Sequence, residues 1–357
     1  MSNPFDNQLP DAGSAEQRGR YARQEAFDRL GREGQRRLCA GRVLLVGCGG
    51  LGSAMAELLA RAGVGFLRIV DRDFVDVSNL HRQSLFTERD AAECLPKAIA
   101  AAEHLAEINS RVEVDPVVED LNCRNIEHLA ESTHLILDGT DNFDTRYLIN
   151  DVAMKLGKPW VYGACIAATG MVWPVLPGLT PCLRCVYPQP PPPGACPTCE
   201  TVGVLPPAVH AVAALQAMAA MQVLAGRIEE LSRGMLEVDL WAGKWRRLDW
   251  GPPAADCPCC RERRFDFLDD EADDSPVALC GRDMWQLGGP TSQTVDFADL
   301  ASRLATVAKT PPVFNRYLLR FAVESYEVTL FRDGRALVRG ASRPEEARSI
   351  YARYLGH

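Results

Sequence analysis

The feature that most constrains the fold is a glycine turn placed directly after a short apolar run. The run Arg42–Val46 leads into a Gly-x-Gly-x-x-Gly motif at residues 47–52. The residues after it, Ser53–Ala62, have helical spacing, and a second apolar run, Phe66–Val70, follows them. Strand, glycine turn, helix and buried strand in this order predict a βαβ unit with a parallel sheet.

Helices and strands continue to alternate after this unit. We predict helix, strand, helix, strand, helix and strand over Lys97–Ile108, Val112–Val118, Ile126–Glu131, His134–Leu137, Phe143–Leu156 and Pro159–Tyr162. Later strands are expected at 171–175, 235–241 and 245–248, with an Ala-rich helix over 209–224, and helical spacing also covers 21–38. The alternation predicts an α/β fold with a doubly wound, Rossmann-like sheet.

Composition suggests four parts. We expect a flexible tail over 1–19, a main domain over 20–265, an acidic linker over 266–275 and a small α+β domain over 276–357. Four consecutive prolines in Gln189–Gly194 cannot continue a helix or a central strand, so residues 187–204 are expected to form a mobile crossing loop.

The net charge of −8 gives no support for binding nucleic acid or an anionic membrane surface. We see no stretch apolar enough to span a bilayer, and the polar start does not resemble a secretory signal, so the expected location is the cytoplasm. Thirteen cysteines in a cytoplasmic chain favour metal or thiol chemistry over disulfides.

The glycine motif predicts a phosphate site. Its backbone N–H groups can approach a phosphate at the start of a helix, where the helix dipole favours negative charge. Asp71 follows Gly52 by 19 residues and is placed to bind a ribose. On its own this pattern is typical of NAD binding, and a glycine turn without ligand is the alternative.

Three later residues favour ATP over NAD. Arg82 and Lys97 are cations on elements after the nucleotide strand, which suits a polyphosphate. Asp141 follows the fourth strand, at the sheet edge where ligands bind, and a carboxylate there can hold Mg²⁺. A nicotinamide oxidoreductase needs neither.

With these motifs in order, the chain resembles the ThiF/MoeB/HesA family, the bacterial relatives of ubiquitin-activating enzymes, over roughly residues 20–260. Arg20-Tyr21-Ala22-Arg23-Gln24 is similar to the family's opening motif, whose second arginine reaches into the neighbouring subunit's ATP site. The resemblance gives that role to Arg23 and implies a homodimer. It implies nucleotide contacts by Gly50, Asp71, Ser78, Asn79, Arg82, Lys97, Asp141 and Asn142, to which the glycine motif adds Gly47, Gly49 and Gly52. One departure is His81, where many relatives carry Gln.

The resemblance also implies the reaction. The C-terminal Gly-Gly carboxylate of a ubiquitin-like sulfur-carrier protein, similar to ThiS or MoaD, would attack the α-phosphorus of ATP and release pyrophosphate. Catalysis would rest on Mg²⁺ at Asp141 and on Arg82, Lys97 and Arg23, which neutralise charge. Thiamine thiazole, molybdopterin and tRNA thiolation use carriers of the same kind, so the pathway stays open. An oxidoreductase and a non-catalytic carrier-binding scaffold are the alternatives.

Cysteines at C-x-x-C spacing predict a zinc site. The three pairs are Cys182/Cys185, Cys196/Cys199 and Cys257/Cys260, and any two can complete a tetrahedral site. Spacing alone permits a local site from the first two pairs. The family resemblance instead selects Cys182, Cys185, Cys257 and Cys260.

The remaining pair is then available for thiol chemistry. Cys199 resembles the family's loop cysteine, which in some members bonds covalently to the activated carrier or a sulfur donor, and Cys196 could resolve such a bond. A cysteine desulfurase or a rhodanese is the expected sulfur donor. The C-terminal domain lacks a recognisable rhodanese loop, and carrier binding and dimer bracing are equal alternatives for its role.

Overall fold

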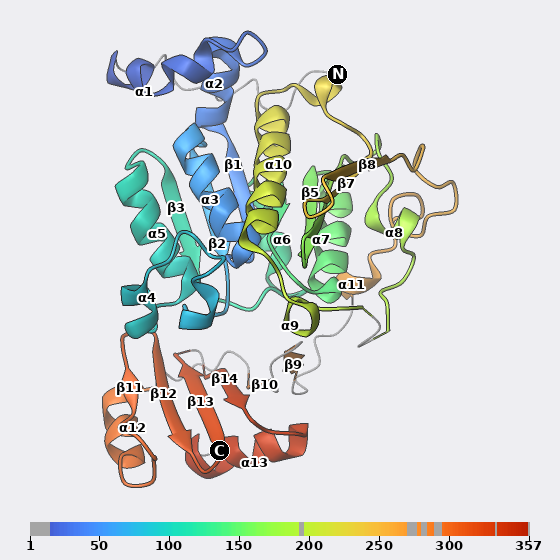
Figure 1. Cartoon of the computed structure of the whole chain (residues 1–357). Coiled ribbons are helices and arrows are strands. Elements are labelled where there is room, and N and C mark those ends of the chain that lie inside the picture. The colour runs from blue at the N-terminus through green and yellow to red at the C-terminus, as the bar shows by residue number, and fades with distance from the viewer. Residues whose placement is uncertain are drawn as a thin grey trace. The chain divides into compact units, whose positions relative to one another are not determined.

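The computed structural model describes residues 15–192, 196–269, 277–279, 284–288, 295–332 and 334–355. The chain divides into two compact units, Met1–Glu271 and Ala272–His357 (Figure 1). Each unit has its own sheet and its own hydrophobic core.

The first unit is built on an eight-stranded sheet in the order β3-β2-β1-β4-β5-β6-β7-β8. The five strands from β3 to β5 run parallel, and β6, β7 and β8 are antiparallel. The strands are β1 (Arg42–Val46), β2 (Phe66–Val70), β3 (Glu113–Val117), β4 (Leu135–Asp138), β5 (Trp160–Ile166), β6 (Thr169–Val175), β7 (Met235–Asp239) and β8 (Lys244–Leu248). The predicted doubly wound α/β fold is confirmed.

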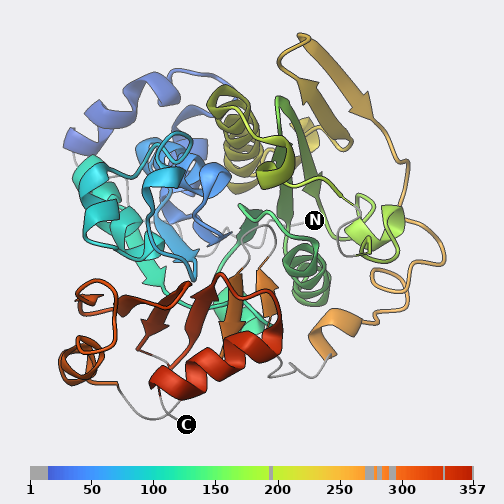
Figure 2. The same ribbon diagram turned by 60° about the horizontal axis from the view of Figure 1, so that its bottom comes forward.

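Both faces of this sheet are covered by helices (Figures 1 and 2). Val43 and Leu45 of β1 join the core under one set of helices, whereas Leu44 and Val46 join the core on the other face. This alternation explains why β1 is a continuous apolar run: successive side chains point to opposite faces, and both faces are buried. The first set is α2 (Gly31–Ala40), α3 (Gly50–Ala62), α5 (Lys97–Ile108) and α10 (Pro206–Leu224), and the second is α6 (Ile126–Glu131) and α7 (Phe143–Leu156).

The helical stretch predicted over 21–38 is two helices, α1 (Ala15–Glu25) and α2. The chain turns between them, and α2 begins at Gly31, whose φ of +61° lies in the left-handed region that favours glycine. α1 starts inside the segment expected to be a tail, of which residues 1–14 lie outside the described part of the chain.

Among the described helices, α10 is long and apolar enough to cross a membrane by length and composition, although we expected no such stretch. It packs against α3, β5 and β6 in the first unit. Its buried Gln216 donates a hydrogen bond of 2.8 Å to the Asp138 carbonyl. These contacts are those of a core helix.

The described part of the second unit is an antiparallel sheet with two helices. Its six strands lie in the order β11-β12-β13-β14-β10-β9. They are β9 (Val277–Leu279), β10 (Met284–Leu287), β11 (Val313–Phe314), β12 (Leu318–Val323), β13 (Tyr326–Phe331) and β14 (Ala336–Arg339), with helices α12 (Phe297–Leu304) and α13 (Pro344–Leu355). The expected α+β architecture is thus observed. The expected linker starts within the first unit, where Asp266–Asp269 form α11.

Candidate functional site

The glycine turn joins β1 to α3 at the carboxyl edge of the parallel strands. Gly47 has φ of +83°, and a Cβ on it would lie 2.9 Å from the Gly139 carbonyl oxygen. A Cβ on Gly52 would lie only 1.9 Å from the Gly47 carbonyl oxygen. Side chains are therefore excluded at Gly47 and Gly52, and the first N–H groups of α3, which have no partner inside the helix, remain close to the sheet edge.

Asp71 follows β2 and holds the turn in place. Its carboxylate accepts hydrogen bonds from the backbone N–H groups of Cys48 (2.6 Å) and Asp73 (2.7 Å). Burial raises the pKa of Asp71, while the neighbouring Lys97 acts to lower it. The predicted ribose-binding carboxylate therefore lies beside the glycine turn.

Lys97, the first residue of α5, points back toward the same edge. Its side chain is 4% exposed, and its ammonium nitrogen lies 2.9 Å from a carboxylate oxygen of Asp73. The Lys97 N–H also donates to the Asp73 carbonyl at 2.9 Å. This double link fixes a buried cation close to the predicted phosphate site.

The segment after β2 carries Ser78 and Asn79 and brings Arg82 to the turn. Asp76 caps the short helix Val77–Asn79 by accepting from the Ser78 N–H at 2.9 Å. Arg82 donates to the Ser78 carbonyl at 3.1 Å, and its Cγ lies 3.7 Å from the position of a Cβ on Gly50. Arg82 thus packs beside the residue that begins α3.

Asp141 and Asn142 lie in the loop between β4 and α7. The Asp141 side chain is exposed, and Asn142 caps α7 by accepting from the Thr145 N–H at 2.9 Å. Since β4 is next to β1 in the sheet, this loop and the glycine turn leave neighbouring strands at the same edge. An exposed carboxylate there is available to a metal ion.

Arg23 lies at the other end of α3. Its helix α1 is held there by Tyr21, which packs against Gly63, and by Gln24, which donates to the Ala62 carbonyl at 3.1 Å. The 13 residues of α3 separate these contacts from the glycine turn by about 18 Å, at a rise of about 1.5 Å per residue. Exposed Arg23 is therefore remote from the residues of its own chain that are predicted to bind the nucleotide.

Cys199 begins the short helix α9 (Cys199–Val202) and is half-buried. Its thiol donates to the Cys165 carbonyl at 3.2 Å. Burial and the negative charge of Asp141 raise the pKa of Cys199, and Arg82 acts in the opposite direction. The loop cysteine is thus electrostatically linked to Asp141 and Arg82, and the raised pKa favours its protonated thiol.

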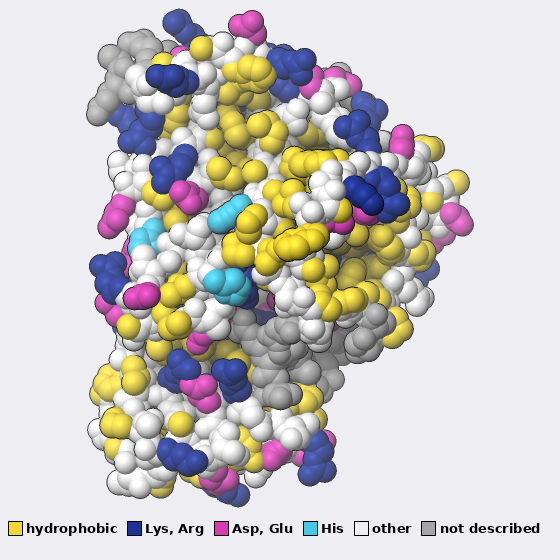
Figure 3. Space-filling model, viewed as in Figure 1, with side chains coloured by type: hydrophobic (Ala, Val, Ile, Leu, Met, Phe, Trp, Pro, Cys, Tyr) yellow, Lys and Arg dark blue, Asp and Glu magenta, His cyan; other side chains and the backbone are white. Residues whose placement is uncertain are grey.

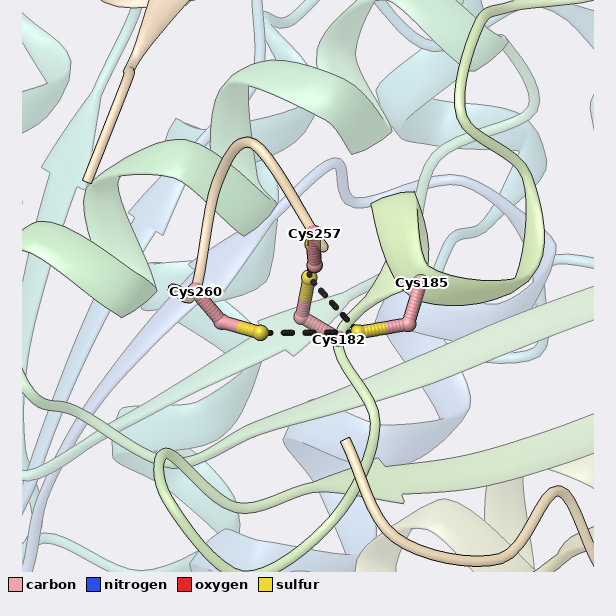
Figure 4. Close-up of side chains that lie close together, drawn as sticks. All are labelled: Cys182, Cys185, Cys257 and Cys260. Carbon is pink, nitrogen blue, oxygen red and sulfur yellow. Dashed lines mark hydrogen bonds between the residues drawn. The ribbon is translucent and has the colours of Figure 1, made fainter. Parts of the chain in front are cut away.

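Four cysteines converge beside α7 in the first unit (Figure 4). The sulfur atoms of Cys182, Cys185, Cys257 and Cys260 lie within 4.8 Å of one another. The Sγ–Sγ distances are 3.6 Å for Cys182 and Cys257, 3.8 Å for Cys182 and Cys185, and 3.4 Å for Cys185 and Cys260, close to the sulfur separation of about 3.8 Å around tetrahedral zinc. These are the two pairs selected by family resemblance, whereas Cys199 contacts Cys165.

The four cysteines can be thiolates at such short distances only if a cation balances their negative charges. Burial, followed by the hydrogen bond with Cys185, raises the pKa of Cys260 to about 12. The turn carrying Cys257 and Cys260 is also tied to α7, because the buried Cys259 thiol donates to Asp151 at 3.2 Å. The residue types, spacing and support therefore fit zinc.

Comparison with known proteins decides the family. The ThiF family model matches residues 21–259. The chain belongs to the ThiF family. It is 40% identical over 339 residues to the sulfur carrier protein ThiS adenylyltransferase of Bacillus subtilis, covering 95% of this chain and 99% of the relative. It is 41% identical over 238 residues to the sulfur carrier protein adenylyltransferase of Thermus thermophilus, covering 65% and 87% of the two chains.

Solved structures agree with the ThiF-family fold. The crystal structure of E. coli MccB with ATP has a TM-score of 0.58 and 20% identity, covering 71% of this chain and 77% of that chain. Family membership rules against the nicotinamide oxidoreductase alternative. The Bacillus subtilis match also extends through most of the second unit, because it leaves out only 5% of the chain.

Sequence reasoning missed one buried ion pair of this ThiF-family chain. Arg146 of α7 donates to the Asp138 carboxylate at 3.0 Å and to the carbonyls of Thr140 (2.9 Å) and Gly163 (2.8 Å). Asp138 also accepts from the Thr140 N–H and hydroxyl. The pair fixes the start of the loop that carries Asp141. The sequence spacing does not indicate that Arg146 is buried, because an arginine inside a helix usually lies on the solvated face of that helix.

Proposed function

We propose that this chain adenylylates the C-terminal glycine of a ubiquitin-like sulfur-carrier protein. The observation that carries the proposal is the convergence of the glycine turn, Lys97 and the Asp141 loop at one sheet edge, in a chain similar over 95% of its length to a sulfur-carrier adenylyltransferase. The carrier carboxylate attacks the α-phosphorus of ATP, the bond to the β-phosphate breaks, and pyrophosphate leaves. The products are the carrier acyl-adenylate and pyrophosphate.

The side chains at this edge suit a reaction between two anions. The carboxylate is already ionised at neutral pH, so no general base is required. The obstacle is charge repulsion, which Lys97 and Arg82 reduce as fixed cations near the phosphates. Asp141 would hold Mg²⁺, which supplies further neutralisation of the polyphosphate when bound.

We further propose a homodimer in which Arg23 serves the partner subunit's ATP site. Two observations support it: Arg23 is remote from the glycine turn of its own chain, and apolar side chains gather over α10 on the surface (Figure 3). Met218 of α10 is 55% exposed and Leu205, just before the helix, is 43% exposed. Exposed apolar groups of this kind favour an interface between copies.

The cysteines receive two separate roles in this proposal. Cys182, Cys185, Cys257 and Cys260 hold a structural zinc ion that closes the unit around α7. Cys199 is a candidate to attack the acyl-adenylate, giving a thioester and AMP, before a cysteine desulfurase or rhodanese supplies sulfur.

Carrier-dependent exchange of pyrophosphate into ATP tests the proposal. Wild-type protein should catalyse exchange only with a carrier ending in Gly-Gly. Asp141→Ala should abolish exchange, whereas Asp144→Ala should retain it, because Asp144 is an exposed carboxylate on the adjoining first turn of α7. Carrier binding without exchange by the wild type would refute catalysis and leave the scaffold alternative.

A further inference from the structure

Two buried amides close to the glycine turn have unpaired oxygen atoms. Asn79 and Gln83 are 3% and 2% exposed, and neither Asn79 Oδ1 nor Gln83 Oε1 has a hydrogen-bond partner among the described residues. Burying an amide without a partner costs free energy, so such groups are uncommon inside proteins. Two of them beside a predicted ligand site indicate partners other than the described residues.

The backbone places both amides on one side of a helical turn. The Gln83 N–H donates to the Asn79 carbonyl at 3.1 Å, as in an α-helix, and residues four apart lie on the same face. Gln83 also faces the phosphate turn: its Nε2 lies 3.8 Å from the position of a Cβ on Gly49. Gly49 immediately precedes α3, whose first N–H groups are free to bind an anion.

We infer that Gln83 is a binding residue for the AMP part of ATP, with Nε2 donating to the α-phosphate and Oε1 accepting from a group on the same ligand. The inference rests on the proposed function and adds a residue to its site. An amide suits this position because it offers donors and an acceptor in one plane. AMP offers phosphate oxygens that accept and ribose hydroxyls that donate, so it can satisfy both ends, whereas inorganic phosphate alone satisfies the donor.

The same geometry explains why the amide would be kept without a partner in the free protein. A group that is unpaired before binding lowers the stability of the free protein and gains its hydrogen bonds only with the ligand. Replacing it with an apolar side chain of similar size should therefore have opposite effects on stability and on affinity. A purely structural glutamine would not behave in this way.

The test is Gln83→Met in the full-length protein, with Gln35→Met as the matched control. Gln35 is also buried, but its amide donates to the Ala62 carbonyl at 2.9 Å and accepts from Gln24. We expect Gln83→Met to raise the melting temperature of the nucleotide-free protein and to weaken ATP and AMP binding about tenfold, or about 1.4 kcal/mol, measured by calorimetry. Adenosine affinity should fall less. Gln35→Met should lower the melting temperature and leave the ATP affinity unchanged.

The outcomes separate this inference from the proposed function. If wild type and Gln83→Met bind ATP equally and both catalyse carrier-dependent exchange, the inference is wrong and the function stands. If Gln83→Met is less stable than the wild type without nucleotide, Gln83 has a structural role and the inference is likewise overturned. If the wild type does not bind ATP, the proposed function fails and this inference fails with it.

Discussion

Replacing Arg146 with methionine should be among the most destabilising single changes in the first unit. The substitution keeps an unbranched apolar stem next to Phe143 and Tyr162 but removes the guanidinium. Asp138, which is fully buried, would keep its bonds to Thr140 and lose its cation. Breaking one partner of a buried pair typically costs about 3–5 kcal/mol, because an uncompensated charge remains inside the protein. That is a large part of a typical free energy of unfolding, about 5–15 kcal/mol.

The matched control is Arg246→Met, in an ion pair of similar length. Arg246 lies 2.7 Å from Glu237 on the surface, and its side chain is 64% exposed, against 6% for Arg146. The control should cost about 0–1 kcal/mol in urea unfolding followed by tryptophan fluorescence. The double variant Arg146→Met with Asp138→Asn should recover roughly 2 kcal/mol of the single-variant loss, because no buried charge is left. If Arg146→Met costs no more than Arg246→Met, burial does not strengthen this pair and the reasoning fails.

Three further predictions concern zinc, the loop thiol and the dimer. Cys260→Ser should lower both the zinc content, measured by mass spectrometry, and the melting temperature. The control Cys196→Ser changes an exposed cysteine and should leave both unchanged. Equal zinc content in the two variants would contradict the four-cysteine site. Because the pKa of Cys199 is raised, its alkylation by iodoacetamide should be slow at pH 7 and accelerate as the pH rises. Asp141→Asn should speed the alkylation several-fold by removing a negative charge. An unchanged rate in that variant would exclude an electrostatic effect of Asp141 on Cys199. Mixing inactive Arg23→Ala and Asp141→Ala subunits should restore about a quarter of wild-type exchange if Arg23 acts on the partner's site, and no recovery would place its action elsewhere.

The fold was predictable because its signals are local. A fully buried parallel strand is a continuous apolar run, and β1 and β2 were located to the residue by that pattern. The break between α1 and α2 was missed because the segment from residue 21 to residue 38 keeps helical spacing through it. The left-handed backbone of Gly31 marks the break, and glycine alone is a weak signal for where a helix ends.

Some residues of the candidate site could likewise be predicted from local sequence signals, and others could not. The glycine turn could be located from the sequence, because the chemistry of a phosphate turn requires glycines at fixed spacing. The choice between zinc-ligand pairs could not be made from spacing, because Cys182 and Cys257 are 75 residues apart and meet only through packing against α7. The family resemblance selected the four cysteines that the folded chain brings together.

Arg146 and Gln83 show most clearly what could not be predicted, because the sequence gives the type of a residue but not the surroundings of its side chain. Arg146 lies in a helix and Gln83 directly follows Arg82, and either would ordinarily be solvated. Burial gives these two side chains different roles. Arg146 is buried with its principal partners supplied by the chain, so its removal should damage the fold. Gln83 is buried with an oxygen that no described residue pairs, so its removal should damage binding. A buried polar side chain is therefore informative about function to the extent that the protein leaves it unsatisfied.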